Sequence, residues 1–202
     1  MTDQMTLSNA LRSETNDLHE VLEKRVMQLN PFADSKHYQG FLRMQLRLHT
    51  AAEPLYHNTK LLNLLPDLSG RSRLNAVLSD CDDVELNNTL IAEDQRIASY
   101  IRISDEYEGL GWLYALEGST LGAAMLLKHV KNQLNLSETF GASHMAAHSD
   151  GRATHWKQFK AMLDQLELTQ SQREKALVGA TQAFIFVTDA VNDVMIDDAV
   201  AS

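Results

Sequence analysis

Apolar residues recur every three to four positions along most of this 202-residue chain, which is the spacing of amphipathic helices. The first stripe consists of Leu7, Leu11, Leu18, Leu22 and Val26. Thr15 interrupts it at a position where the pattern expects an apolar residue. The same spacing predicts helices over about residues 7–29, 36–58, 71–78, 85–100, 105–133, 150 or 154 to 166, and 169–195. The chain is therefore predicted to be all-α.

Turn-forming and polar residues mark the expected ends of these helices. Residues 30–34 read as a turn, and Ser35 suits the N-cap position of the next helix. Pro54 is expected to kink that helix. Residues 61–70 and 135–148 read as loops, and Thr169 with Gln172 fits a capping box.

Composition agrees with one helical domain. The chain has only 9 Gly and 3 Pro, and its aromatic fraction is 6%. Runs of β-branched residues, which favour strands, are scarce. We expect a single domain over residues 1–202, with residues 1–6 and 197–202 frayed.

Charge and cysteine content narrow the class of protein. The net charge of -9 disfavours nucleic acids and anionic membranes as general partners. Cys81 is the single cysteine, in an acidic stretch that we expect to be exposed, so no disulfide framework is possible. No apolar run approaches about 18 residues, so no membrane span is expected. The first residues lack the features of a signal peptide, which predicts a cytoplasmic protein.

The predicted helix over residues 105–133 carries two glycines in its interior. Gly118 and Gly122 lie one turn apart on one face, with Ser119 and Ala123 beside them. Each interior glycine costs a helix roughly 1 kcal/mol relative to alanine, and the pair lets the helix bend. Such a face serves either close packing of another helix or close approach of a flat ligand to the backbone.

Several common chemical motifs are missing from the eight histidines and their surroundings. No Glu-x-x-His or His-Glu-x-x-His occurs, which argues against a di-iron bundle and a zinc protease. His144 and His148 have the spacing of a metal pair on a helix, but their segment reads as a loop. The glycines match neither a phosphate loop nor a dinucleotide fingerprint.

His19 stands beside the apolar stripe of the first helix, one turn before Glu23. The pair is either an ordinary surface contact or a metal-binding imidazole whose second nitrogen donates to a carboxylate. A flat metal macrocycle between His19 and the glycine helix would have one protein ligand and one confined open position. That arrangement is typical of an oxygen-activating haem.

The stretches Leu11–Glu23 and Tyr114–Gly122 resemble the proximal and distal helices of haem oxygenases, in particular the compact bacterial enzymes that produce biliverdin. The resemblance implies an all-α, single-domain helical bundle. In it, haem lies between the proximal N-terminal helix and a kinked, glycine-rich distal helix. The helical pattern of the whole chain, to about Met195, fits that family.

The resemblance also implies roles for individual residues. The iron ligand is His19 and the acidic residue that hydrogen-bonds it is Glu23; the distal backbone belongs to Gly118 and Gly122, and the contacts to the haem propionates come from Arg12, Tyr114 and Lys157. Ser119 stands where the animal enzymes have an aspartate, and Ala123 replaces a second glycine. Met27 and His129 occupy positions near the haem edge where some relatives have lysine. The Arg12 and Tyr114 pair resembles the members selective for the α-meso carbon.

The reaction implied by the resemblance is oxidative cleavage of haem to biliverdin, with release of ferrous iron and carbon monoxide. Haem b is then both substrate and cofactor, and O2 is the oxidant. Because the chain carries no flavin or nucleotide motif, electrons are expected from an external reductase or ferredoxin. We expect a monomer.

Two other classes are consistent with parts of the sequence. A non-catalytic haem carrier or sensor would keep His19 but would not need a bendable helix at Gly118 and Gly122. A haem-free member of the wider helical superfamily, which includes thiamine-degrading enzymes, would need other polar groups in the core. In the thiaminases these include a nucleophilic cysteine, for which Cys81 is a poor candidate.

Overall fold

The computed structural model describes residues 5–197, which form helices joined by short connections, without a strand in that range. The helices are α1 Leu7–Gln28, α2 Ser35–Tyr56, α3 Thr59–Leu64, α4 Leu74–Asp83, α5 Asn88–Ser99, α6 Glu106–Leu134, α7 Arg152–Asp164 and α8 Gln170–Val194, with 3₁₀ turns η1 Leu68–Gly70 and η2 Ser143–Met145. The predicted all-α class is confirmed. Of residues 1–6 and 197–202, which we expected to fray, residues 1–4 and 198–202 lie outside the described part of the chain. Asp197, which is described, accepts a hydrogen bond from Arg25.

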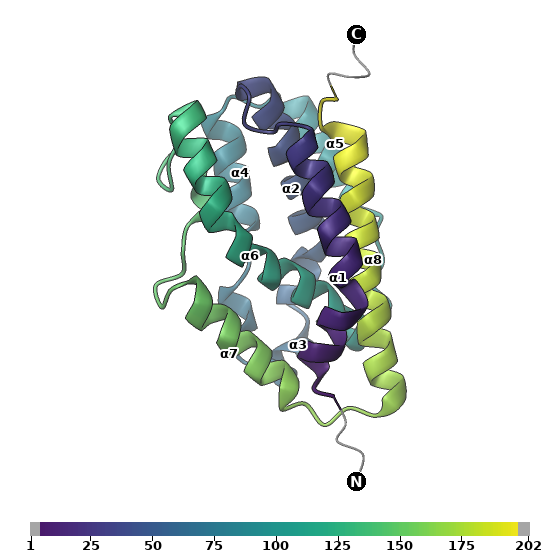
Figure 1. Cartoon of the computed structure of the whole chain (residues 1–202). Helices are drawn as coiled ribbons and strands as arrows, with labels where there is room; N and C mark the ends of the chain where they lie inside the picture. The colour runs from purple at the N-terminus through teal and green to yellow at the C-terminus, as the bar shows by residue number, and fades with distance from the viewer. Residues whose placement is uncertain (1–4, 198–202) are drawn as a thin grey trace.

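Helix α8 organises the bundle, packing against α6, α1 and α2, while α2 in turn packs against α4 and α5 (Figure 1). Figure 1 shows α1 and α8 side by side, and α6 crossing the molecule before it turns upward beside α4. Helix α7 lies against α6 and α1. The largest side chains of the core are fully buried, among them Trp112, Tyr38, Tyr56, Phe41 and Phe159.

Several local predictions need correction. Asp34, not Ser35, is the N-cap of α2, and its carboxylate accepts the His37 backbone N–H. Residues 61–70 are not a loop throughout, because they include the end of α3 and all of η1. The Asn58 side chain caps α3, and Leu61 is completely buried, so a side-chain cap and one apolar anchor suffice for this short helix. At Thr169, the predicted capping box with Gln172 is present.

The acidic stretch around Cys81 was wrongly expected to be exposed. It forms the last turns of α4, which place Cys81 and Asp80 fully inside. Burial raises the pKa of the Cys81 thiol to about 12, so it is inert as a nucleophile near neutral pH. The Cys81 thiol therefore cannot supply the nucleophile that a thiaminase-like activity would need.

The Asp80 carboxylate is satisfied by η2, because it accepts the backbone N–H groups of Ser143 and His144 and binds the His144 imidazole Nδ1 at 2.6 Å. Burial would raise the pKa of Asp80, but these hydrogen bonds and the His144 charge outweigh it and hold the pKa below its usual value. His144 therefore serves the fold. His148 instead stacks on His155, and no group of three potential metal ligands gathers within residues 5–197.

Helix α6 is, within the described part of the chain, the one helix long and apolar enough to cross a membrane by those measures alone. Half of its most apolar window is buried inside the structure. A core helix meets the same criterion, and α6 packs against α8, α7 and α2.

Candidate functional site

The middle of α6 presents apolar side chains to solvent. Leu121 and Met125 have exposed fractions of 43% and 59%, although their spacing with Leu113 and Leu116 suggests one buried stripe. Leu113 and Leu116 are buried as expected. The stripe therefore divides after residue 117: the first half of α6 packs in the core, while the second half exposes an apolar surface of the kind that binds a ligand or partner.

The glycines of α6 serve different purposes. A Cβ on Gly111 would come within 2.0 Å of the Ala176 carbonyl oxygen of α8, so Gly111 allows the close crossing of the two helices. A Cβ on Gly122 would meet nothing within 4 Å. Helix packing thus explains Gly111 but not Gly122, whose backbone is open to an approaching group.

Gly118 is covered on one side by an aromatic ring. A Cβ there would lie 3.4 Å from Cη2 of Trp156, an ordinary contact distance. The Trp156 indole also packs against Tyr114, with ring centroids 5.2 Å apart. Trp156 of α7 therefore borders the open stretch that begins at Gly118.

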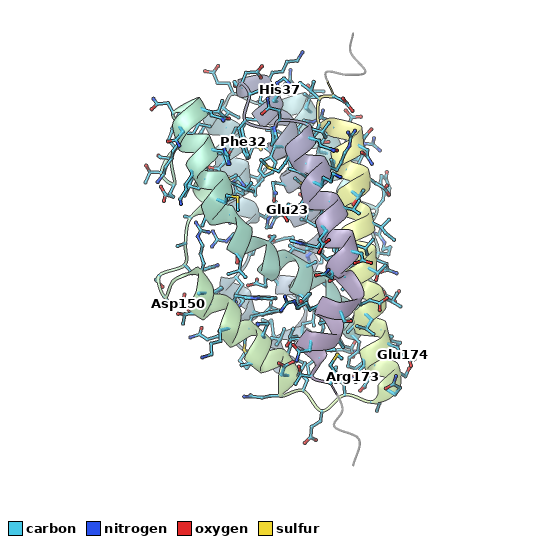
Figure 2. All side chains as sticks on the ribbon, viewed as in Figure 1. Glu23, Phe32, His37, Asp150, Arg173 and Glu174 are labelled. Atoms are coloured by element: carbon cyan, nitrogen blue, oxygen red, sulfur yellow. The ribbon has the colours of Figure 1, made fainter. Side chains whose placement is uncertain are left out.

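Both side chains of the predicted proximal pair on α1 are exposed. The His19 ring lies edge-on to Phe184 of α8, with centroids 6.0 Å apart and an interplanar angle of 84°. Neither imidazole nitrogen of His19 makes a hydrogen bond within residues 5–197, and none links it to Glu23. Figure 2 labels Glu23 between the ribbons of α1 and α6. The ring is thus oriented by Phe184 while both nitrogens stay available.

The residues expected at the propionates come from three helices. Tyr114 on α6 is buried, and burial raises the pKa of its phenol while the Arg12 charge opposes that rise, so the Arg12 guanidinium acts on the Tyr114 hydroxyl. Lys157 is exposed on α7, one residue after Trp156. The Arg12 charge is thus close enough to Tyr114 to act on its phenol, while the role of the two residues at the propionates stays a prediction.

The remaining predicted positions differ in orientation. Ser119 is exposed, and its hydroxyl donates to the Leu116 carbonyl at 2.6 Å. Ala123 is buried, whereas Gly122 before it is exposed. Met27 is partly exposed, whereas the His129 ring is stacked on Phe32 with centroids 5.7 Å apart. His129 therefore packs against the turn before α2.

The sequence did not predict the polar cluster that lies next to Gly118, which consists of Arg71, Glu117, Asp67 and His155. Arg71 donates to the Glu117 carboxylate at 2.8 Å, to Asp67 at 2.7 and 2.9 Å, and to His155 Nε2 at 2.7 Å. Burial raises the pKa of Glu117 to about 6 against the opposing charge of Arg71. The one local signal was that Glu117 falls on the buried side of α6; its partner lies 46 residues away.

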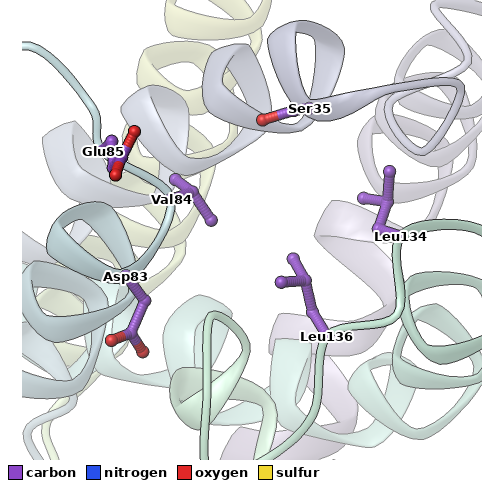
Figure 3. Close-up of a pocket in the computed structure, with 6 residues that line it drawn as sticks. All are labelled: Ser35, Asp83, Val84, Glu85, Leu134 and Leu136. Carbon is purple, nitrogen blue, oxygen red and sulfur yellow. The ribbon is translucent and has the colours of Figure 1, made fainter.

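Figure 3 shows a pocket elsewhere in the molecule, lined by Ser35, Asp83, Val84, Glu85, Leu134 and Leu136. These residues belong to the start of α2 and to the ends of α4 and α6 with their following turns. None of the candidate site residues lines it, so it is separate from the candidate site.

Comparison with known proteins gives a consistent result. The family model "Heme oxygenase" matches residues 5–193. The heme oxygenase PigA of Pseudomonas aeruginosa is 39% identical over 185 residues, which cover 91% of this chain and 90% of PigA. A solved NO- and CO-bound haem oxygenase of Neisseria meningitidis is 30% identical, with a TM-score of 0.84 over 95% of this chain and 93% of that one.

More distant structures share the fold alone. Haem oxygenase-1 of Synechocystis, solved with haem, is 18% identical with a TM-score of 0.72, over 94% of this chain and 92% of that one. The family match spans nearly the whole chain, and the relative from Pseudomonas exceeds a third in identity over nine-tenths of both chains. By sequence and by fold, this chain belongs to the haem oxygenase family.

Proposed function

We propose that this chain holds its substrate haem between α1 and α6, with His19 as the iron ligand. As a haem oxygenase, it cleaves haem to biliverdin with release of ferrous iron and carbon monoxide, using O2 and electrons from an external donor. The observation that supports the placement is the combination of an exposed His19 imidazole with an apolar, glycine-opened surface on α6. Bound haem supplies the iron at which oxygen is activated.

The proximal side is assigned to α1. One nitrogen of His19 would ligate the iron, and the other would donate a hydrogen bond to Glu23 one turn away, which would fix the tautomer and strengthen the ligand. In the structure the His19 ring already packs edge-on against Phe184. Glu23 needs only a side-chain rotation to reach it, since residues four apart are neighbours on a helix.

The distal side is assigned to Gly118, Ser119, Gly122 and Ala123. Gly122 lets the backbone approach the macrocycle, because no atom occupies the space that a side chain would take. Leu121 and Met125 supply apolar contact beside it. The Ser119 hydroxyl, exposed while it donates to Leu116, can still accept a hydrogen bond from a distal water.

The propionates are assigned to Arg12, Tyr114 and Lys157. Arg12 and Lys157 are exposed cations, and the Tyr114 hydroxyl is a neutral donor whose pKa is raised by burial. Guanidinium and carboxylate form short, oriented hydrogen bonds, which would hold the macrocycle in one rotation. The pairing of Arg12 with Tyr114 supports cleavage at the α-meso carbon.

The electron donor is proposed to be a separate redox protein, a reductase or a ferredoxin. The enzyme is proposed to act in the cytoplasm as a monomer, with no need for a membrane or nucleic acid. The net charge of -9 supports the absence of a membrane or nucleic-acid partner, because it disfavours association with phosphate-rich surfaces.

The test is an absorption titration with haemin, followed by reductant in air, on the wild type and two histidine variants. The wild type should bind one haemin with a histidine-type Soret band that decays to a biliverdin spectrum. His19→Ala should lose that band and the turnover. His57→Ala is the matched control, because His57 also lies one helical turn from a glutamate, Glu53, to which it is hydrogen bonded at 2.9 Å.

His57→Ala should behave as the wild type does. Biliverdin formation near the wild-type rate in His19→Ala would overturn the proximal assignment. A stable histidine-type spectrum that never decays, with several electron donors, would instead indicate a carrier or sensor.

A further inference from the structure

Behind Gly118, the backbone of α6 rests on a buried ion pair. Glu117 and Arg71 have exposed fractions of 3% and 2%, and their side chains meet at 2.8 Å. Arg71 follows η1, and its remaining donors are held by Asp67. Removing two charges from water is expensive, so such a pair adds little to net stability but fixes one geometry, since only that geometry satisfies both groups.

Helix α7 ties this pair to the open face of α6. His155 Nε2 accepts from the same Arg71 nitrogen at 2.7 Å, and its Nδ1 lies 3.4 Å from Asp150. Figure 2 labels Asp150 in the loop that leads into α7. Trp156, which follows His155 in the sequence, borders Gly118. Two consecutive residues of α7 therefore make different contacts: His155 binds the Arg71–Glu117 pair, and Trp156 packs beside the α6 backbone at Gly118.

A third contact from α7 reaches the α6 backbone. Arg152 Nη1 donates to the Thr120 carbonyl at 3.2 Å, and its other terminal nitrogen donates to the Met145 carbonyl. A guanidinium on a mid-helix carbonyl competes with the helix ladder, as do the Ser119 and Thr120 hydroxyls on the carbonyls three residues earlier. Figure 1 shows that α6 changes direction along its length.

A helix with two interior glycines can bend, so its path depends on the contacts around it. Propensity is weak at Gly118 and Gly122, so the position of this turn depends on what holds residues 117–120. Contacts that hold them come from Arg71 and His155, which face the Glu117 carboxylate, and from Arg152, which donates to the Thr120 carbonyl. A small displacement there changes how closely the glycine backbone approaches the substrate, and displacements of about 1 Å alter reaction rates by up to a hundredfold.

We propose that Glu117, held by Arg71 and His155, is a positioning residue that fixes the α6 backbone at Gly118 and so determines which meso edge of haem is oxidised. The inference rests on the proposed placement of haem against α6. It assigns the selectivity of cleavage partly to a buried cluster that does not touch the substrate. Glu117 acts through the backbone it belongs to.

The test compares Glu117→Gln with Asp94→Asn. Both substitutions replace a fully buried, arginine-paired carboxylate by its amide, but Asp94 lies on α5 and binds Arg43 and Arg47 of α2, away from α6. Each variant is first shown to be folded by circular dichroism and to bind one haemin with a histidine-type Soret band. The biliverdin isomers are then separated by chromatography.

We expect the minor isomers to increase severalfold in Glu117→Gln, while Asp94→Asn keeps the wild-type distribution. An unchanged distribution in folded Glu117→Gln, or an equal change in both variants, would overturn the inference. If Glu117→Gln does not fold, the isomers of His155→Phe are measured instead. That variant removes the contact from α7 but leaves the ion pair between Arg71 and Glu117. It should move the isomers in the same direction, and an unchanged distribution would again contradict the inference.

Failure of the proposed haem placement gives a different result. The wild type would then lack the histidine-type band, or His19→Ala would turn over normally, whatever the isomers of the Glu117 variant. The two hypotheses are therefore separated by measurements on different proteins.

Discussion

Gly111, Gly118 and Gly122 follow one another along α6, yet each meets a different environment. Gly111 faces the Ala176 carbonyl, Gly118 faces an indole and Gly122 faces open space. A residue's contribution to stability and its contribution to function can therefore be separated by substitution at Gly122.

We expect Gly122→Ala to raise stability and lower activity. The methyl group meets no protein atom, and alanine is favoured over glycine in a helix by about 1 kcal/mol, so the free energy of unfolding should rise. The same methyl would stand against the macrocycle and slow turnover. Urea unfolding and a biliverdin assay on one preparation test this. Gly122→Ala with higher stability and unchanged turnover would mean that the face is not against the substrate.

The protonation of Glu117 should appear in the pH dependence of stability. Burial raises its pKa to about 6 from an ordinary value of 4.5. The protonated form is therefore favoured in the folded state, and this contribution is complete below pH 4.5 and lost as the pH rises through 6. The difference of roughly 1.5 units corresponds to on the order of 2 kcal/mol.

Urea unfolding of the wild type and Glu117→Gln at several pH values measures this contribution. The stability of the wild type relative to Glu117→Gln should fall as the pH rises from 4.5 to 7. A relative stability that stays constant or increases over that range would contradict the sign of the shift.

At the scale of elements, one carboxylate joins helices that are distant in sequence. Asp94 of α5 is fully buried and binds Arg43 and Arg47 of α2 at 2.7 Å, and Arg47 also binds Asp193 of α8 at 2.5 Å. Three helices are thereby locked in register on the side of the bundle away from α7.

We expect Asp94→Ala to destabilise the fold by about 3–5 kcal/mol, because it leaves two arginine side chains without their buried partner. Haem binding by the molecules that remain folded should not change, since Asp94 contacts neither α1 nor α6. Thermal unfolding and haemin titration at low temperature measure the two quantities. A loss below 1 kcal/mol would show that the network is replaceable by water.

Most of the helices, and the interior position of Gly118 and Gly122 in α6, were predictable because each depends on residues close in sequence. The period of Leu7, Leu11 and Leu18 gives α1 within one residue at its end. The cluster of Arg71, Glu117 and His155 was not predictable, because its members are brought together from three separate segments. The burial of Cys81 was missed for a related reason: its acidic neighbour Asp80 is satisfied by backbone N–H groups 63 and 64 residues away.

At the scale of the whole molecule, the haem oxygenase fold separates a rigid frame from a softer site. The frame is α2, α5 and α8, joined by ion pairs of the buried Asp94 and Arg47. The proposed site lies on α1 and on the glycine half of α6, where apolar side chains and a free imidazole face solvent. Local opening is expected to concentrate where burial is least.

Haem should therefore slow hydrogen exchange unevenly. We expect added haemin to protect backbone amides of α1 and of α6 beyond Gly118, and to leave those of α5 nearly unchanged, because only the former elements gain contacts. Hydrogen–deuterium exchange read by mass spectrometry resolves these segments. Equal protection throughout would indicate general stabilisation, and protection confined to α5 would contradict the placement of the site.

The exposed Leu121 and Met125 carry a consequence for the protein without its substrate. On the proposed placement, haem covers this apolar surface, so we expect the haem-free enzyme to aggregate more readily than the haem-bound enzyme. Each turnover that consumes haem would expose the surface again. The supply of haem would then affect the solubility of the enzyme that degrades it.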